Sequence, residues 1–236
     1  METSSPRLSL AAGDEANVLG TYDSPLHWRH AETLFTALDR LMRRLRWKPA
    51  MLSGVAVSVG PGSFTGIRIG LAAARSMGQA LHIPVVGVSS LETLAWPLLK
   101  DGRWVSPVLD ALRGDVFTGI FQRGRGGRTS RWLPESRLSA QHWLKAVRML
   151  PRPEPVWVAG EPAVLGGIEK TVRRIHDAGS SHLYPKASAL LELARPRLSK
   201  AGSRSYGHAR PLYLRDAAAQ ERRHASTGPA KRRLAR

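Results

Sequence analysis

The stretch VSVGPGSFTGIRIGLAAARSMGQAL, residues 57–81, decides the fold class of this chain. A valine-rich apolar run at residues 54–59 predicts a buried strand, and after the glycine-rich turn we expect a helix over residues 65–81. A second apolar run at 84–89 predicts another strand, and residues 91–99 predict another helix. The strand–helix–strand–helix order predicts an α/β fold with some parallel strand pairing.

Upstream of this stretch the sequence predicts a hairpin and an amphipathic helix. Apolar and polar residues alternate at the start of the segment 8–24, and GDEA supplies its turn. Residues 30–47 place Leu34, Leu38 and Leu41 on one apolar face, with arginines mainly on the opposite side. This pattern predicts an amphipathic helix with one strong apolar stripe.

Downstream of residue 100 the patterns predict a second α/β unit. We expect a β-hairpin made of residues 104–110 and 116–122. Two helices are expected at 139–150 and at 186–198, the second of them broken near Pro196. Two more strands or extended segments are expected at 155–160 and 211–216. The chain is accordingly divided into an N-terminal subdomain at 1–100, a second subdomain at 101–216 and a basic disordered tail at 217–236.

The positive charge is concentrated in the second half. Residues 1–100 hold 10 Lys and Arg against 7 Asp and Glu, and residues 101–236 hold 26 against 11, which together give the net +18. Such a basic half favours contact with nucleic acid or an acidic partner, although scattered basic residues can also be a solvated surface. The chain has no cysteine, which excludes disulfides and thiol chemistry. It shows no signal peptide and no membrane-length apolar run, so a cytoplasmic location is expected.

The glycine loop does not match a known phosphate-binding motif. No lysine lies between Lys48 and Lys100, which excludes a Walker A loop, and the spacings of a dinucleotide fingerprint and of a nucleophile elbow also fail. Two interpretations stay open. The loop is a structural turn in which a hydroxyl group caps the helix, or the free N–H groups of the helix bind an anion. The residues concerned are Gly60, Gly62, Ser63, Thr65, Gly66 and Arg68.

A ridge of small residues follows the loop along the helix. Gly70, Ala74 and Gly78 are spaced by four, and glycine inside a helix costs about 1 kcal/mol relative to alanine, so the ridge needs a packing reason. It either packs on this chain's own sheet or lets a helix of another subunit approach closely. The second interpretation is slightly favoured.

No catalytic machinery is evident. His27, His30 and Glu32 lie close together but lack the spacing of a metal motif, and a polar loop explains them more simply. Asp110 and Asp115 bracket a turn, for which aspartates are common residues. We therefore predict no catalytic residue and no metal site in this chain.

The segment SVGPGSFTGIRIGLAAARSMGQALHIPVVGVSSLETLA, residues 58–95, closely resembles the bacterial TsaB (YeaZ) family. Three flanking pieces are similar to other family signatures: ETSSPRLSLA at 2–11, RHAETL at 29–34 and PLYLRD at 211–216. The resemblance covers residues 1 to about 216 and is weakest from 120 to 205.

The resemblance implies an actin-like ATPase (ASKHA, ribonuclease H-like) fold made of two α/β subdomains. It also implies a non-catalytic role in forming N6-threonylcarbamoyladenosine at position 37 of tRNAs that read ANN codons. The family member pairs with its paralogue TsaD, which carries the metal and performs the transfer, and TsaE, an ATPase, joins the complex. No cofactor is expected on this chain, since ATP and metal belong to the partner subunits, and tRNA is met through the complex. A homodimer is an alternative assembly.

Because the family dimerises through helices of its N-terminal subdomain, the resemblance assigns the interface to two sets of residues. They are Leu34, Leu38 and Leu41 on one helix, and Gly70, Ala74 and Gly78 on the other.

The chain departs from the family pattern in three places. Met1 stands directly before Glu2, where the family has apolar residues that form a central strand, so we expect the start to be assigned too far downstream. Leu112 replaces an arginine that is common in the family. The tail at 217–236 extends beyond the family core, and we expect it to add affinity for tRNA.

Two other functions compete with this reading. One is an independent actin-fold ATPase, kinase or glycoprotease-like hydrolase, which intrinsic ATP turnover or a bound metal would favour. The other is a nucleic-acid-binding protein that acts alone through its basic half, which tight, salt-sensitive tRNA binding without a partner would favour.

Overall fold

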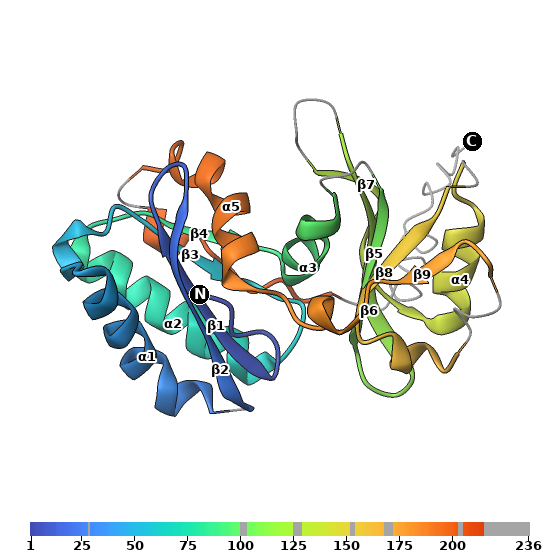
Figure 1. Cartoon of the computed structure of the whole chain (residues 1–236), viewed down its shortest axis with the longest axis horizontal. Coiled ribbons are helices and arrows are strands. Elements are labelled where there is room, and N and C mark those ends of the chain that lie inside the picture. The colour runs from blue at the N-terminus through green and yellow to red at the C-terminus, as the bar shows by residue number, and fades with distance from the viewer. Residues whose placement is uncertain are drawn as a thin grey trace, which may run out of the picture.

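The computed structural model describes residues 1–27, 29–99, 103–124, 129–151, 154–167, 172–202 and 205–214. Two α/β bodies lie side by side (Figure 1). The first body holds β1 (Arg7–Gly13), β2 (Val18–His27), α1 (His30–Leu45), β3 (Val55–Ser58), α2 (Phe64–Leu81), β4 (Val85–Val88) and α5 (Ala187–Leu198). The second body holds β5 (Trp104–Asp110), β6 (Asp115–Arg123), β7 (Thr129–Ser139), α4 (Ala140–Arg148), β8 (Val156–Gly160) and β9 (Ile175–Asp177). Between them stands α3 (Ser90–Leu99).

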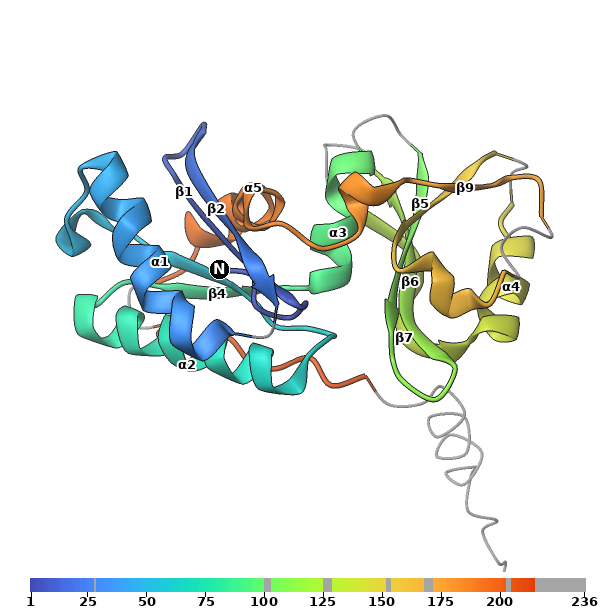
Figure 2. The same ribbon diagram turned by 60° about the horizontal axis from the view of Figure 1, so that its bottom comes forward.

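The first body has three layers. Strands β1 and β2 form an antiparallel hairpin, and β3 pairs with β4 in parallel, which confirms the predicted α/β class. Helices α1 and α2 lie side by side on one face of these strands, and α5 covers the other face (Figure 2). The apolar stripe of α1 packs on Leu8 and Leu10, and that of α2 packs on Val57 and Val85.

Helix α5 corrects the predicted domain boundary. Residues 101–216 were assigned to the second subdomain, but α5 packs on β1, β3 and β4, and the backbone N–H of Ala187 donates to Ser9 Oγ at 2.9 Å. The segment 205–214 also returns, since the N–H of Leu212 donates to the carbonyl of Val59 at 2.8 Å. Residues 208–214 of this segment form neither a helix nor a strand, and the predicted tail at 217–236 lies outside the described residues. The first body is therefore discontinuous in sequence.

The sheet of the first body is interrupted between β1 and β3. Met1 and Glu2 stand in the gap: the Met1 amine donates to Ala56 O at 2.8 Å, and Ser58 N donates to Met1 O at 3.0 Å. On the other side Glu2 exchanges two backbone hydrogen bonds with Ser9. A cavity of about 80 Å³ adjoins Met1, with an apolar lining that includes Ala11, Met42, Val55, Met77 and Leu190. Two strand edges thus face each other across a largely apolar gap.

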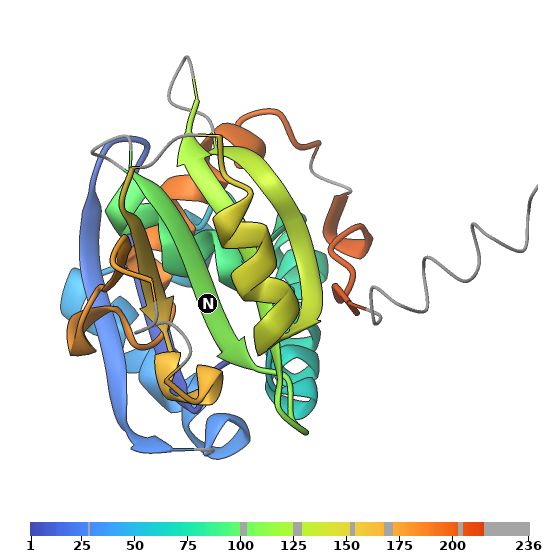
Figure 3. The ribbon, with the colours of Figure 1, turned by 90° about the vertical axis from the view of Figure 1, so that its right-hand side faces the viewer.

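The second body is a five-stranded sheet in the order β7-β6-β5-β8-β9. Strands β5, β6 and β7 are antiparallel neighbours, whereas β5, β8 and β9 run parallel. Helix α4 covers one face and α3 the other (Figure 3). Trp143 of α4 is fully buried and donates its indole N–H to Ser106 Oγ at 2.9 Å. The hairpin at 104–122 is confirmed, whereas β7 and β9 were not predicted.

Shorter elements complete the chain. Single 3₁₀ turns occur at Pro49–Met51, Pro162–Leu165, Ser180–His182 and Ser205–Gly207. Helix α5 continues through Pro196 to Leu198, so the predicted break is wrong. Pro196 has no N–H to donate to the carbonyl of Glu192, and the helix continues with one hydrogen bond fewer. In the part of the chain that the structure describes, no helix combines the length and apolar character needed to cross a lipid bilayer.

Candidate protein interface

The glycine loop between β3 and α2 is filled by the chain's own backbone. Gly62 has φ +146°, and a Cβ atom there would overlap the carbonyl oxygen of Ser4; a Cβ at Gly66 would overlap that of Thr3. Ser63 donates its backbone N–H to the same Ser4 carbonyl at 2.7 Å. The glycines therefore serve a close approach between this loop and residues 3–4.

Ser63 is the residue that caps α2. Its hydroxyl oxygen accepts the N–H of Gly66 at 3.1 Å, which satisfies one of the free donors of the first turn. Gly60, with φ +96°, packs on Ile67, and its carbonyl accepts the N–H of Ser90 at 2.9 Å. The turn-and-cap interpretation thus accounts for four of the six loop residues. Only Thr65 and Arg68 expose their side chains to solvent, so an anion site has little of the loop left to use.

The small-residue ridge of α2 faces inward. A Cβ at Gly70 would overlap the Thr3 side chain, Ala74 is fully buried, and a Cβ at Gly78 would overlap Val85. On α1, Leu34 and Leu41 are buried and Leu38 is half-buried in the cluster with Leu8 and Leu10. All six residues assigned to an interface therefore face the protein's own sheet. An interface made by these helices has to use their outer faces.

The outer faces of α1 and α2 carry exposed aromatic side chains. Phe35 on α1 is 58% exposed and Phe64 on α2 is 54% exposed. The Arg68 guanidinium lies 3.8 Å from the centroid of the Phe64 ring, and the ring of Tyr213, itself 55% exposed, lies 5.9 Å from it. We call Phe64, Arg68 and Tyr213 the aromatic cluster. This cluster was not predicted, although the sequence holds a signal for it: an aromatic residue four positions before an arginine, off the apolar stripe of the helix.

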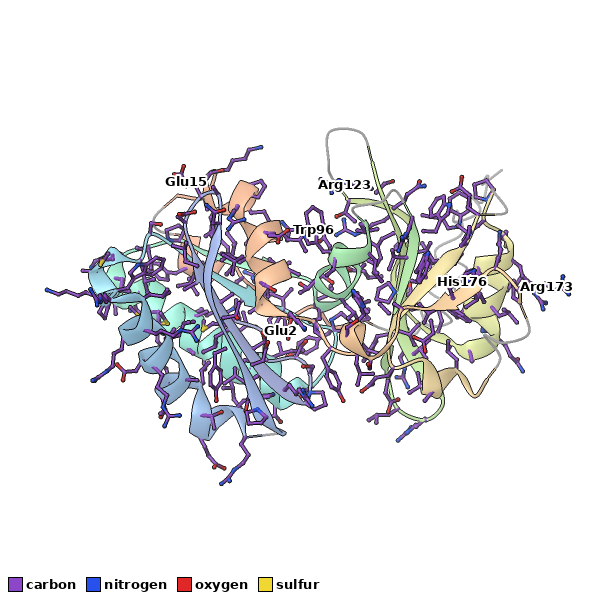
Figure 4. The ribbon with its side chains drawn as sticks, in the orientation of Figure 1. Glu2, Glu15, Trp96, Arg123, Arg173 and His176 are labelled. Carbon is purple, nitrogen blue, oxygen red and sulfur yellow. The ribbon has the colours of Figure 1, made fainter. Side chains whose placement is uncertain are left out.

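Residues beside the loop carry two buried ionisable groups, the Glu2 carboxyl and the Met1 amine. Glu2 is fully buried in the first body (Figure 4), and its Oε1 accepts hydrogen bonds from Ser4 N and Ser4 Oγ, each at 2.6 Å. Burial raises the pKa of Glu2, against the lowering effect of these bonds. Burial also lowers the pKa of the Met1 amine from 8.0 to about 6. Both groups are thus shifted toward their neutral forms, which suits a packed interior.

A second polar network joins the two bodies. Glu92 on α3 is buried and lies 2.9 Å from Arg131 of β7 and 2.9 Å from Arg197 of α5. Ser89 donates its hydroxyl to Glu135 of β7, whose pKa burial raises. Ser89 also caps α3, since its hydroxyl accepts the N–H groups of residues 91 and 92. The network fixes α3 and α5 against the second sheet.

The other candidates for chemistry have structural partners. The Nε2 atom of His30 lies 2.8 Å from Ser5 O, within hydrogen-bond distance. Asp110 Oδ1 accepts the N–H of Leu112 at 2.7 Å within the turn, and Asp115 pairs with Arg137 at 3.0 Å. Among the described residues, no group of three His, Cys, Asp or Glu side chains is arranged to hold a metal ion.

Comparisons with known proteins point to one family. The family model of TsaD, tRNA N6-adenosine threonylcarbamoyltransferase, matches residues 26–143. The tRNA threonylcarbamoyladenosine biosynthesis protein TsaB of Bacillus subtilis is 34% identical over 65% of this chain and 66% of its own length. TsaB of Escherichia coli is 28% identical over 70% of this chain and 71% of its own. The chain thus matches about two thirds of the length of these relatives.

A solved structure shows the same fold over nearly the whole chain. It is a Pseudomonas aeruginosa protein described as similar to the peptidase YeaZ, and it superimposes with a TM-score of 0.76 at 25% identity. The superposition covers 91% of this chain and 97% of that one. The likeness therefore includes both bodies, not only the segment around the glycine loop.

Proposed function

Since the chain belongs to the TsaB (YeaZ) family, we propose that it takes part in forming N6-threonylcarbamoyladenosine at position 37 of ANN-reading tRNAs as a non-catalytic subunit. Its partner is a TsaD-like paralogue, which supplies the metal and the transfer chemistry. A TsaE-like ATPase joins the pair, and tRNA is met through the complex.

The observation that carries this proposal is the set of exposed aromatic residues on α1 and α2. Phe35 and Phe64 lie on the outer faces of two long helices that stand side by side (Figure 2). Aromatic residues and arginine are enriched among the residues that dominate binding energy at interfaces, and the aromatic cluster combines both types. A partner helix that packs over these faces would remove the rings from water.

The glycine loop supports the non-catalytic part of the proposal. Two of the elements that would approach a phosphate, Gly62 and Gly66, are instead in contact with the backbone of Thr3 and Ser4. A nucleotide would have to displace these residues, which also hold Glu2 in place through Ser4. The loop consequently acts as packing that orients α2, and ATP and metal are assigned to the partner subunits.

Co-purification with the TsaD of the same organism tests the interface. We expect wild type to form a complex and Phe35→Glu/Phe64→Glu to lose it, because two charges would have to be buried against the partner. Met149→Glu is the matched control, since Met149 is 66% exposed at the C-cap of α4 in the second body. Gly70→Leu is not a suitable interface variant, because its side chain would collide with Thr3 and disrupt the packing of α2 inside the chain. Equal binding of the aromatic variant and the control contradicts the proposed interface.

An activity assay separates this proposal from an independent enzyme. Wild type and the aromatic variant are compared for tRNA modification in the reconstituted system, and the chain alone is tested for ATP turnover. Modification that fails only with the aromatic variant supports a subunit that acts through α1 and α2. ATP turnover by the chain alone, unaffected by that variant, favours the enzyme alternative instead.

A further inference from the structure

A groove of about 830 Å³ lies beside β4, between the end of α5 and the returning segment 208–210. The edge of β4 is closed there: Val85 is buried, the Gly87 carbonyl accepts Arg197 Nη1 at 3.0 Å, and the turn at Ser205–Gly207 packs on the strand. A ligand in this groove therefore has to be held by the side chains of its walls rather than by the backbone of β4.

The walls of the groove are basic. Arg197, Lys200, His208 and Arg210 line it, and none of the described residues that line it is acidic. We call this feature the basic groove. Arg197 is engaged, because it binds Glu92 at 2.9 Å and the carbonyl of Gly87. Lys200 and Arg210 are exposed and form no ion pair with the described residues, so their charges are left for a ligand.

The sequence around the basic groove strengthens its positive potential. Residues 193–215, which supply both walls, contain 6 Lys and Arg and no Asp or Glu. The whole chain carries a net charge of +18. A surface of one sign of charge raises the local concentration of oppositely charged ligands and speeds their association. The ligand that this surface favours is consequently a polyanion.

The side chains of the basic groove suit a phosphate backbone better than bases. Lysine and arginine are common contacts of phosphate oxygens, which position a nucleic acid without reading its sequence. No aromatic residue is among the described residues that line the groove, so bases have no ring to stack on. Double-stranded RNA is recognised mainly by its shape and by its sugar and phosphate groups. An RNA stem therefore fits the groove better than a single-stranded loop.

An acidic protein segment complements the basic groove less well than an RNA stem does. Duplex nucleic acid carries on the order of one negative charge per 1.7 Å of its axis. An extended chain of glutamates carries one per residue, or about one per 3.3 Å. The chain's own tail at 217–236 contains 6 Lys and Arg against 1 Glu, and a second copy carries the same net charge of +18, so neither complements the groove.

We propose that the basic groove binds the phosphate backbone of a double-stranded stem of tRNA, with Lys200 and Arg210 in contact with phosphate oxygens. The choice of tRNA rests on the proposed function, whereas the charge of the groove does not. None of the described residues that line the groove belongs to α1 or α2. The tRNA and a partner on the outer faces of these helices can therefore be bound at the same time.

Fluorescence anisotropy with the full chain tests the proposal. The probes are an unmodified tRNA transcript and an RNA hairpin with a twelve-base-pair stem, each measured over a range of salt concentrations. We expect both to bind wild type. Lys200→Gln/Arg210→Gln should weaken both roughly tenfold at a fixed salt concentration. It should also reduce the slope of log affinity against log salt by about 2, because each lost phosphate contact lowers that slope by about 1.

A matched control removes the same charges elsewhere. Lys145→Gln/Arg148→Gln changes one lysine and one arginine in the last turn of α4, in the second body. All four substituted residues are exposed, so the fold is retained in both variants. We expect the control variant to bind the tRNA and the hairpin within about twofold of wild type, because α4 does not line the groove.

Four results would overturn the proposal. The hairpin does not bind, the control variant weakens binding as much as the groove variant does, or the groove variant keeps the salt slope of wild type. In the fourth, a peptide of ten glutamates binds wild type more tightly than the hairpin does and is lost in the groove variant. That result identifies the groove as a site for an acidic protein segment.

Co-purification with TsaD separates this inference from the proposed function. The groove variant should still form the complex, and Phe35→Glu/Phe64→Glu should still bind the hairpin, because the two surfaces have no residue in common. If wild type forms the complex but the hairpin is not bound, only the inference about the groove is wrong. If the groove binds the hairpin but no complex forms, the proposed function is wrong and the groove remains a site for duplex RNA.

Discussion

A strand added ahead of Met1 should stabilise the first body. The perturbation is a five-residue extension of alternating valine and isoleucine, placed to continue the Met1–Glu2 segment between β1 and β3. The cavity beside Met1 has a volume of about 80 Å³, and filling it at about 24 cal/mol per Å³ is worth about 2 kcal/mol. New backbone hydrogen bonds to β1 and β3 would add to this value.

A second contribution comes from the buried amine and depends on pH. The pKa of the Met1 amine falls from 8.0 to about 6 in the folded state, which corresponds to roughly 3 kcal/mol. The unfolded chain binds this proton more readily, so stability rises with pH between 6 and 8, and the full penalty applies below pH 6. Any extension converts the amine into a neutral peptide group and removes the penalty.

Urea unfolding near pH 5 and near pH 9 separates the two contributions. The control is a five-residue Gly-Ser extension, which removes the charge without filling the cavity. We expect both extensions to stabilise at the lower pH, and only the apolar extension to stabilise at the higher pH. If the apolar extension is no more stable than the Gly-Ser extension at either pH, the gap between β1 and β3 does not accept a strand and the reasoning fails.

Three further predictions concern single residues. Gly62→Ala should lower the free energy of unfolding by more than about 3 kcal/mol, because a Cβ atom there overlaps the Ser4 carbonyl and φ is +146°. Gly114→Ala, where φ is +82° and no atom is close, should lower it by about 1 kcal/mol. The urea midpoints of the two variants test this difference. Trp143→Phe should cost about 1–3 kcal/mol through a lost hydrogen bond to Ser106 and a cavity, and an unchanged unfolding midpoint would contradict this. The raised pKa of Glu135 means that its protonated form stabilises the fold, an effect present below the ordinary pKa of 4.5 and lost as pH rises through the folded value. Glu135→Gln should therefore lose less stability than wild type as pH rises above 4.5. Melting temperatures of the two proteins that change with pH in the same way would refute this prediction.

Hydrophobic periodicity predicted the elements whose buried face is continuous. Helices α1 and α2 and the strands β3, β5 and β6 were found because their apolar residues repeat at the period of the element. Strand β7 was missed because it lies at the edge of its sheet, where TSRWLPESRLS shows mostly half-buried and exposed positions. Strand β9 is only 3 residues long, which is too short for any period to appear.

The sequence assigned the candidate interface to α1 and α2, but it did not predict which face of each helix is exposed. A row of Gly70, Ala74 and Gly78 lets any neighbour approach closely, and the sequence does not say whether that neighbour is a partner helix or the chain itself. The answer depends on Thr3 and Val85, which fill the ridge from distant parts of the chain. Tertiary contacts of this kind leave no local pattern.

The return of α5 to the first body reverses the order in which the molecule can fold on the ribosome. Strands β3 and β4 emerge early, yet the face that carries Ala56 and Val88 has no cover until Leu190 and Leu193 of α5 have left the exit tunnel. The second body, from β5 to β9, is contiguous in sequence and complete by residue 177. The second body, although it is synthesised later, can therefore fold first, whereas β3 and β4 cannot complete their packing until α5 has been synthesised.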